Sequence, residues 1–311
     1  MQLANTPEPT TRRRDRFRGV LVGLAVGDAL GVPTAFQPPQ PEEQRVAEMI
    51  GGGWQQRAPG EWTENTETTL CVVESLLNRA VFDPDDIARR LVSWMRSGAR
   101  DISVHTRHVL TCIEQGMPWE QASRAARALE PGQASSDALV RCAPLALFFA
   151  HSPEYVAGLS PVLARITHTH PDCEQACVCL SVALVHLLMG KHRLEAVQEG
   201  ELACADAPQE LRERVRRAGQ LPLETAPTGH VLDTMEVAFW SLLNTTTLEE
   251  ALVSVVNRGG DASASGATTG ALVGACYGYT AIPSRWVQSL KDVGRLLDYA
   301  DRLFDLATHF T

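Results

Sequence analysis

The stretch CEQACVCLSVALVHLL, residues Cys173–Leu188, decides the fold class because it is apolar on nearly every side of a helix. A helix that is apolar all round has to be packed by other elements on each face. The stretch therefore predicts a central helix surrounded by others. Cys173, Cys177 and Cys179 could be drawn as a metal site, but their spacing matches no zinc module, so we interpret them as core residues.

Helical periodicity continues in both directions from this stretch. In residues 68–80, TTLCVVESLLNRA, the apolar residues recur at spacings of three and four. The segment DDIARRLVSWMRSG repeats the pattern, with Asp83 or Asp85 as its cap. Residues 266–278, GATTGALVGACYG, are rich in small residues that permit close contact between helices. The alternation typical of exposed strands is almost absent, so we predict an all-α, single-domain helical bundle.

Composition narrows the function classes. The chain has 311 residues, 44% of them hydrophobic, and a formal net charge of −9. Global disorder is excluded, and nucleic acid and membrane surfaces are not expected partners. We expect no bilayer-spanning run of about 18 apolar residues and no secretory signal. We predict a flexible N-terminus over residues 1–14 and one domain over residues 15–311.

The eight cysteines sit mostly inside apolar runs and include no Cys-x-x-Cys pair. Reduced, buried cysteines behave in this way in cytoplasmic proteins. The sequence therefore predicts a cytoplasmic protein with free thiols.

Polar residues gather where helices are expected to begin or end. Asp28 follows Gly27 in GVLVGLAVGDALGVPTAF, where it could be a hydrogen-bonding residue between helix and loop. Thr63 or Thr66 can cap a helix, with Glu64 near its positive end. His168 precedes the most apolar helix, and a lone histidine there is more often structural than a ligand.

Another such stretch lies near the C-terminal end, in NRGGDASASGATTGALVGA. Gly259 and Gly260 allow a tight turn, and Asp261, Ser263 and Ser265 offer three oxygens before a helix.

Seven short stretches, in order from Phe17 to about Phe304, together resemble the ADP-ribosylglycohydrolase family. They are RGVLVGLAVGDALG, GEWTENTETTL, DISVHTR, SSDALVRCAPLAL, ITHTHP, GHVLDTMEVAFW and NRGGDASASGATTGALVGA. The resemblance implies an all-α bundle with a cleft whose base holds two divalent ions, usually magnesium or manganese. It also implies hydrolysis of the bond between ADP-ribose and an arginine, a serine or a related acceptor.

The resemblance also implies where the metal ligands would lie. At most of these positions this sequence has a different residue from the family's ligand. The family's glutamate falls on Ala35. Its Thr-Asp-Asp-Thr run is Thr63, Glu64, Asn65 and Thr66 here, and its Asp-Ala-Asp-Thr run is the segment 261–264, which reads Asp-Ala-Ser-Ala. Of the implied ligands, only the threonine at 63 and the aspartate at 261 are unchanged.

Two carboxylates at these positions carry a charge of −2, whereas two divalent ions carry +4. Bringing two such ions within about 4 Å without neutralising charge is strongly unfavourable. Helix N-termini add further positive potential. We therefore predict at most one weakly held Mg²⁺ or monovalent ion, with the candidate ligands Thr63, Glu64, Asn65, Asp261 and Ser263.

The remaining site residues also follow from the resemblance. Asp101 and Glu64 are the candidate catalytic residues, Asp101 as general base or acceptor of a ribose hydroxyl, and a helix cap is the alternative for Asp101. Arg141 is a candidate phosphate contact or a salt-bridge residue within the bundle. The candidate substrate-binding residues are Asp28, Ser136, Asp137, His168, His230, Gly260 and Ser265.

Two kinds of function stay open at this point. One is hydrolysis of an ADP-ribosyl glycosidic bond at a modified site. The other is a catalytically dead member that serves as an ADP-ribose sensor, a regulator or a scaffold. The expected ligand in either case is an ADP-ribose-type small molecule or an ADP-ribosylated protein.

Overall fold

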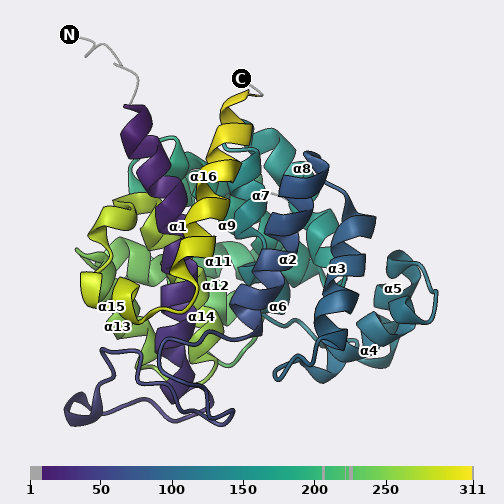
Figure 1. Cartoon of the computed structure of the whole chain (residues 1–311), viewed down its shortest axis with the longest axis horizontal. Coiled ribbons are helices and arrows are strands. Elements are labelled where there is room, and N and C mark those ends of the chain that lie inside the picture. The colour runs from purple at the N-terminus through teal and green to yellow at the C-terminus, as the bar shows by residue number, and fades with distance from the viewer. Residues whose placement is uncertain (1–8, 205–206, 221, 224–226, 310–311) are drawn as a thin grey trace.

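The computed structural model describes residues 9–204, 207–220, 222–223 and 227–309, and the described chain is all helix and loop (Figure 1). Within these residues the β pairing consists of two isolated bridges, Gly52 with Arg57 and Ser135 with His230. The predicted all-α class is confirmed.

The α-helices are α1 Thr10–Gly31, α2 Glu64–Arg79, α3 Pro84–Arg96, α4 Val104–Glu114, α5 Trp119–Leu129, α6 Asp137–Val140, α7 Ala143–Phe148, α8 Pro153–Arg165, α9 Pro171–Leu188, α10 Arg193–Ala203, α11 Gln209–Arg217, α12 Val231–Asn244, α13 Leu248–Val256, α14 Ala262–Tyr277, α15 Ser284–Ser289 and α16 Val293–His309. Short 3₁₀ turns cover Val32–Thr34, Glu42–Gln44 and Tyr279–Ala281.

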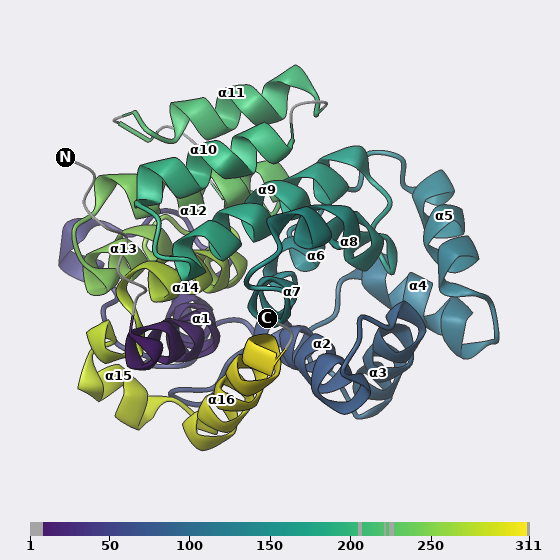
Figure 2. The ribbon, with the colours of Figure 1, turned by 90° about the horizontal axis from the view of Figure 1, so that it is seen from above.

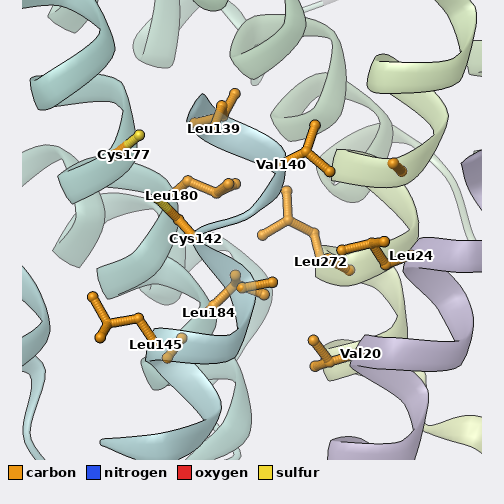
Figure 3. Packing of buried hydrophobic residues seen from close by; sticks show 14 of the residues in the cluster. Val20, Leu24, Leu139, Val140, Cys142, Leu145, Cys177, Leu180, Leu184 and Leu272 are labelled. Carbon is orange, nitrogen blue, oxygen red and sulfur yellow. The ribbon is translucent and has the colours of Figure 1, made fainter. Parts of the chain in front are cut away.

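Helix α9 is the buried helix that the opening stretch predicts, since nearly every residue from Cys173 to Leu188 is buried. In Figure 2 it lies among α8, α10, α12 and α14. Figure 3 shows its side chains Cys177, Leu180 and Leu184 packed toward residues 139–145 and, beyond them, α14 and α1. One continuous hydrophobic cluster therefore joins the N-terminal, central and C-terminal helices.

Helices α1 and α14 lie against each other in antiparallel directions at backbone contact. A Cβ added at Gly23 would lie 2.4 Å from the carbonyl oxygen of Gly270, and one at Gly27 would lie 1.9 Å from that of Gly266. Glycine is required at these positions because any side chain would collide with the opposite backbone. The small residues that the sequence marks on each helix thus meet one another.

The N-terminal boundary differs from the prediction. Helix α1 begins at Thr10, so residues 10–14 are helical, while residues 1–8 lie outside the described part of the chain. Arg14 makes ion pairs with Asp301 and Asp305 of α16. These contacts hold the first turns of α1 against the C-terminal helix, and the flexible segment expected up to residue 14 is wrong for residues 10–14.

Two helical segments differ from the expectation that no run is long and apolar enough to span a bilayer. Thr10–Thr34 and Pro171–Leu188 meet the length and composition of a membrane span, although 89% and 78% of their apolar windows are buried inside the protein. Packing against other helices accounts for their apolar composition, as for core helices in general.

The antiparallel pair also explains how a site can form at one end of it. The last turn of α1 contains Asp28 and Gly31, and a Cβ at Gly31 would lie 2.4 Å from the carbonyl oxygen of Ala262 in the first turn of α14. Asp28 in turn binds the residues that start α2. The N-termini of α2 and α14 therefore converge at the end of α1.

Candidate functional site

Asp28 anchors the start of α2 from inside the protein. Its Oδ2 accepts hydrogen bonds from the backbone N–H of Thr63 and Thr66 at 3.0 Å and from the Thr66 hydroxyl at 2.7 Å. Its Oδ1 accepts from the Thr63 hydroxyl at 2.7 Å. Asp28 is fully buried, and this burial raises the pKa of its carboxyl group. The structure therefore gives Asp28 a positioning role, in place of the expected contact with substrate.

Thr63 is the N-cap of α2, as one of the sequence alternatives predicts. Its hydroxyl donates to Asp28 and accepts from the backbone N–H of Asn65 at 3.3 Å. The side-chain amide of Asn65 donates to the same oxygen at 3.0 Å. The hydroxyl group of Thr63 is thus fully engaged by protein partners.

Glu64 and Asp101 form a carboxyl pair next to this cap. Burial first, and then the hydrogen bond that protonated Glu64 donates to Asp101, raise the pKa of Glu64 well above its ordinary value. The Oε2 atom of Glu64 is buried with no hydrogen-bond partner. The side chain of Gln55 donates to Oδ2 of Asp101. The pairing therefore favours the protonated form of Glu64, beside Asp101, whose side chain is held in place by the amide of Gln55.

Asp137 joins the same neighbourhood from α6. Its Oδ2 accepts from the hydroxyls of Ser103 at 2.8 Å and Thr106 at 2.9 Å, and its Oδ1 accepts from Ser135 at 2.6 Å. Burial acts to raise the pKa of Asp137, but His168 and these hydroxyl donors outweigh it and lower the pKa. Asp137 is therefore a fixed negative charge in the site.

Asp261 precedes α14 and faces the same group of residues. Its Oδ2 accepts from the Ser136 hydroxyl at 2.8 Å, and its backbone N–H donates to the carbonyl of Pro227 at 2.6 Å. Burial raises its pKa to about 6, the Ser136 bond opposes this, and the charges of Asp137 and Asp101 add to the rise.

The structure thus brings four acidic residues close enough to influence one another's charge: Glu64, Asp101, Asp137 and Asp261. The sequence analysis counts Glu64 and Asp261 as the carboxylates at the implied ligand positions, and the structure places Asp101 and Asp137 beside them. Since the pKa values of Glu64 and Asp261 are raised, the cluster lowers its repulsion by retaining protons.

A chain of hydrogen bonds orients His168 behind Asp137. Arg141 donates to the hydroxyl oxygen of Thr167, and this hydroxyl lies 2.8 Å from Nδ1 of His168. The hydroxyl therefore donates to Nδ1, which places the ring proton on Nε2. Nε2 has no hydrogen-bond partner and lies 4.0 Å from Oδ2 of Asp137. Burial lowers the pKa of His168 to about 3, so the ring is neutral.

Arg141 is buried and binds protein oxygens. Besides Thr167, it donates to the backbone carbonyl of Asp137 at 3.0 Å. Arg141 therefore holds the start of α6, where Asp137 lies. This role differs from both the phosphate contact and the salt bridge considered from the sequence.

The remaining predicted substrate residues lie around the same region in different settings. His230 is the N-cap of α12, accepts from the N–H of Leu232 at 3.2 Å and is 35% exposed in its side chain. Gly260 has a φ of +57°, and a Cβ there would lie 2.0 Å from the carbonyl oxygen of Pro227. Ser265 is fully buried within α14, so it lies one turn inside the helix that it was expected to precede.

Three of the positions assigned to metal ligands by resemblance, Ala35, Thr63 and Ser263, line one small pocket together with Asp101. The residues present nevertheless do not fit a pair of divalent ions. The Thr63 hydroxyl is engaged, Asp261 holds a serine hydroxyl, and Ala35 offers no oxygen from its side chain. Among the described residues, no group of three or more His, Cys, Asp or Glu side chains is arranged to hold a metal ion.

Several residues of the site were not found by the sequence analysis. Gln55 lies in a loop without periodicity, and nothing in the sequence marks it as a partner of Asp101. The hydroxyls of Ser103 and Thr106 both come from the start of α4, and that of Ser135 comes from two residues before Asp137. Only Ser103 carries a local signal, since it caps α4.

Comparisons with known proteins agree with this architecture. A family model described as ADP-ribosylglycohydrolase matches residues 9–309. The chain is 32% identical to "ADP-ribosylarginine hydrolase Tri1" of Serratia proteamaculans, over 97% of this chain and 83% of that protein. It is also 32% identical to "ADP-ribosyl-[dinitrogen reductase] glycohydrolase" of Rhodospirillum rubrum, over 89% and 90%. A solved structure named "ADP-ribosylglycohydrolase-related protein complex" aligns with a TM-score of 0.84 and 35% identity, covering 96% of this chain and 99% of that one.

Proposed function

The chain belongs to the ADP-ribosylglycohydrolase family, and we propose that it hydrolyses an ADP-ribosyl–arginine bond through Glu64 and Asp101. The observation that carries the proposal is the carboxyl pair of Glu64 and Asp101, in which burial and the bond to Asp101 raise the pKa of Glu64. Most glycosidases cleave the glycosidic bond with two carboxyl groups whose pKa values differ, one acting as acid and the other as base or nucleophile. Arginine as acceptor follows from the names of the similar proteins.

The proposed reaction assigns one proton transfer to each carboxyl group. Glu64 donates its proton to the guanidine nitrogen as the bond from this nitrogen to the anomeric carbon breaks. Asp101 accepts a proton from the water whose oxygen forms the new bond to that carbon. The products are ADP-ribose and arginine, and the hydrogen bond between the two carboxyl groups returns the proton to Glu64.

The other residues serve binding and orientation in this proposal. His168 offers an N–H at Nε2, fixed by Thr167, and His230 offers an exposed ring for contact with adenine. The fixed charge of Asp137 disfavours direct contact with phosphates. The proposed reaction needs no ion, and binding of one Mg²⁺ or monovalent ion at Glu64 and Asp261 stays a prediction. The eight free cysteines support a cytoplasmic location.

The test uses a peptide that carries an ADP-ribosylated arginine. Hydrolysis is measured as the release of ADP-ribose, once in buffer with EDTA and once in buffer with Mg²⁺. We expect turnover that is equal in both buffers, and a loss of at least 100-fold in kcat for Glu64→Gln with little change in KM. Turnover that requires Mg²⁺, or Glu64→Gln with wild-type activity, would refute the proposed chemistry.

A second candidate function is binding of ADP-ribose without hydrolysis. The observation that favours it is the replacement of family carboxylates by Ala35, Asn65 and Ser263. It predicts ADP-ribose binding by calorimetry together with no turnover in either buffer. The same two measurements therefore separate an enzyme from a sensor.

A further inference from the structure

A large polar groove lies outside the candidate site. Its volume is about 840 Å³, and it lies between α2, α3 and the start of α16, which neighbour one another in Figure 2. A volume of this order accommodates a ligand of small-molecule or cofactor size. None of the four acidic residues of the candidate site lines it.

Cations outnumber carboxylates along the groove. The cations are Arg57, Arg89, Arg90, Arg100, Lys291 and Arg295. The carboxylates are Glu61, Glu67, Glu74, Asp86 and Asp292. The groove is therefore net positive on a chain whose net charge is −9. Such a local surplus attracts anions.

Sharing of carboxylates increases the positive character at two places along the groove. Glu61 faces both Arg100 at 2.5 Å and Lys291 at 3.8 Å. Glu74 faces Arg90 at 3.5 Å and Arg295 at 2.6 Å, and Asp86 faces Arg90 at 2.6 Å and Arg89 at 3.4 Å. Each of the two clusters thus contains one more cation than carboxylates and keeps about one unit of positive charge.

Arg57 supplies an unused donor at the inner end of the groove. Its side chain is only 2% exposed, Nε donates to Oε1 of Gln55 at 2.6 Å, and Nη1 lies 3.6 Å from Glu67. Its Nη2 atom is buried and has no hydrogen-bond partner. A buried guanidinium N–H without an acceptor is costly, and an oxygen ligand in the groove would satisfy it.

We propose that this groove is a binding site for an oxyanion, a phosphate or carboxylate group, held by Nη2 of Arg57 and by the surplus charge of Arg295 and Lys291. The site is separate from the proposed catalytic pair but touches it. Gln55 accepts from Arg57 and donates to Asp101, so one side chain joins the inner end of the groove to the candidate base.

The experiment titrates inorganic phosphate, and separately acetate, into the full-length protein at constant ionic strength while its Tm is followed. A ligand that binds only the folded state raises Tm in a saturable manner. We expect such a rise with phosphate if the natural ligand is a phosphate ester, and with acetate if it is a carboxylate. The absence of a saturable rise with either anion would overturn the proposal.

Two variants locate the binding. Arg57→Lys keeps the charge but removes Nη2, and we expect at least tenfold weaker binding of the anion. Arg295→Gln changes a residue that is 44% exposed, so it tests the groove even where the buried substitution prevents folding. The matched control is Arg285→Gln, which is also 44% exposed and paired with glutamates but does not line the groove.

Arg295→Gln should weaken binding several-fold, and Arg285→Gln should bind like the wild type. Equal binding by the wild type, Arg295→Gln and Arg285→Gln would show that the anion binds elsewhere and would overturn the assignment to this groove. Because the readout is Tm and no turnover is measured, the result is independent of the hydrolysis proposed above.

Discussion

At the scale of single residues, the site depends on buried groups whose surroundings set their charge. Hydroxyl donors help to lower the pKa of Asp137, while burial and the bond to Asp101 raise the pKa of Glu64. His168 is neutral because it is buried, and Thr167 fixes which of its nitrogens carries the proton. Neighbouring side chains of the same kind thus take different protonation states within one cluster.

The neutral state of His168 makes a prediction about stability and pH. Its pKa is about 3 in the folded chain, against an ordinary value of 6.5, so the unfolded chain binds one more proton between these values. The stabilisation is present above about pH 6.5 and is lost as the pH falls toward 3. In urea unfolding, His168→Gln should show a shallower loss of unfolding free energy over this range. The exposed His108→Gln should keep the wild-type slope, and an unchanged slope in His168→Gln would contradict the assignment.

Asp28 makes a second prediction at this scale. Asp28→Asn replaces an acceptor of four hydrogen bonds with a group that offers one acceptor, leaving buried donors of Thr63 and Thr66 unsatisfied. The free energy of unfolding should fall by about 3 kcal/mol. Asp298→Asn, an exposed aspartate in an i,i+4 pair, should change it by less than about 0.5 kcal/mol. A loss no larger than this control would remove the positioning role of Asp28.

At the scale of elements, the contact between α1 and α14 places the site. Gly23 and Gly27 of one helix face Gly270 and Gly266 of the other, and this register brings the end of α1 beside the start of α14. A shift of one helix along the other would separate Asp28 from the residues that it positions.

Substitution of a glycine at this contact tests its energetic role. In Gly23→Ala the new Cβ would lie 2.4 Å from the carbonyl oxygen of Gly270, so the helices must separate, and we expect a loss of about 2 kcal/mol or more in unfolding free energy. Gly158→Ala is the control, because Gly158 lies in α8 with open space around it and should gain up to about 1 kcal/mol. Equal effects of the two substitutions would show that the close contact is not required.

Helix positions could be predicted from periodicity, but their partners could not. The spacing of apolar residues identifies α2, α3 and α9, and the cap at Thr63 follows from local chemistry. The small residues of α1 and α14 indicate that each helix approaches another backbone closely, without saying which one. Pairing is a long-range property that a local pattern does not encode.

The same limit applies to the site. Asp101 could be singled out by resemblance, whereas its partner Gln55 comes from a loop with no periodic signal. The resemblance marks Asp137 as a candidate substrate-binding residue, but its partners Ser103 and Thr106 belong to the start of α4, which only folding brings beside α6.

At the scale of the whole molecule, the chain keeps the family fold over nearly its full length. Ala35, Thr63, Asp101 and Ser263 still meet in one pocket. The central claim is that these positions form the family's site with its metal ligands replaced. If so, substituting the family's ligand residues at these positions should restore metal binding, because the fold already brings the positions together.

The most direct test is the shift of Tm with added Mg²⁺ in the wild type and in a variant with restored ligands. The substitutions are Ala35→Glu, Glu64→Asp, Asn65→Asp, Ser263→Asp and Ala264→Thr. The metal-free variant should be less stable, since its carboxylates repel one another, and Mg²⁺ should raise its Tm by binding the folded state. We predict a saturable rise of several degrees in the variant and little change in the wild type. A folded variant that gains no more from Mg²⁺ than the wild type would contradict the convergence of these residues on one metal site.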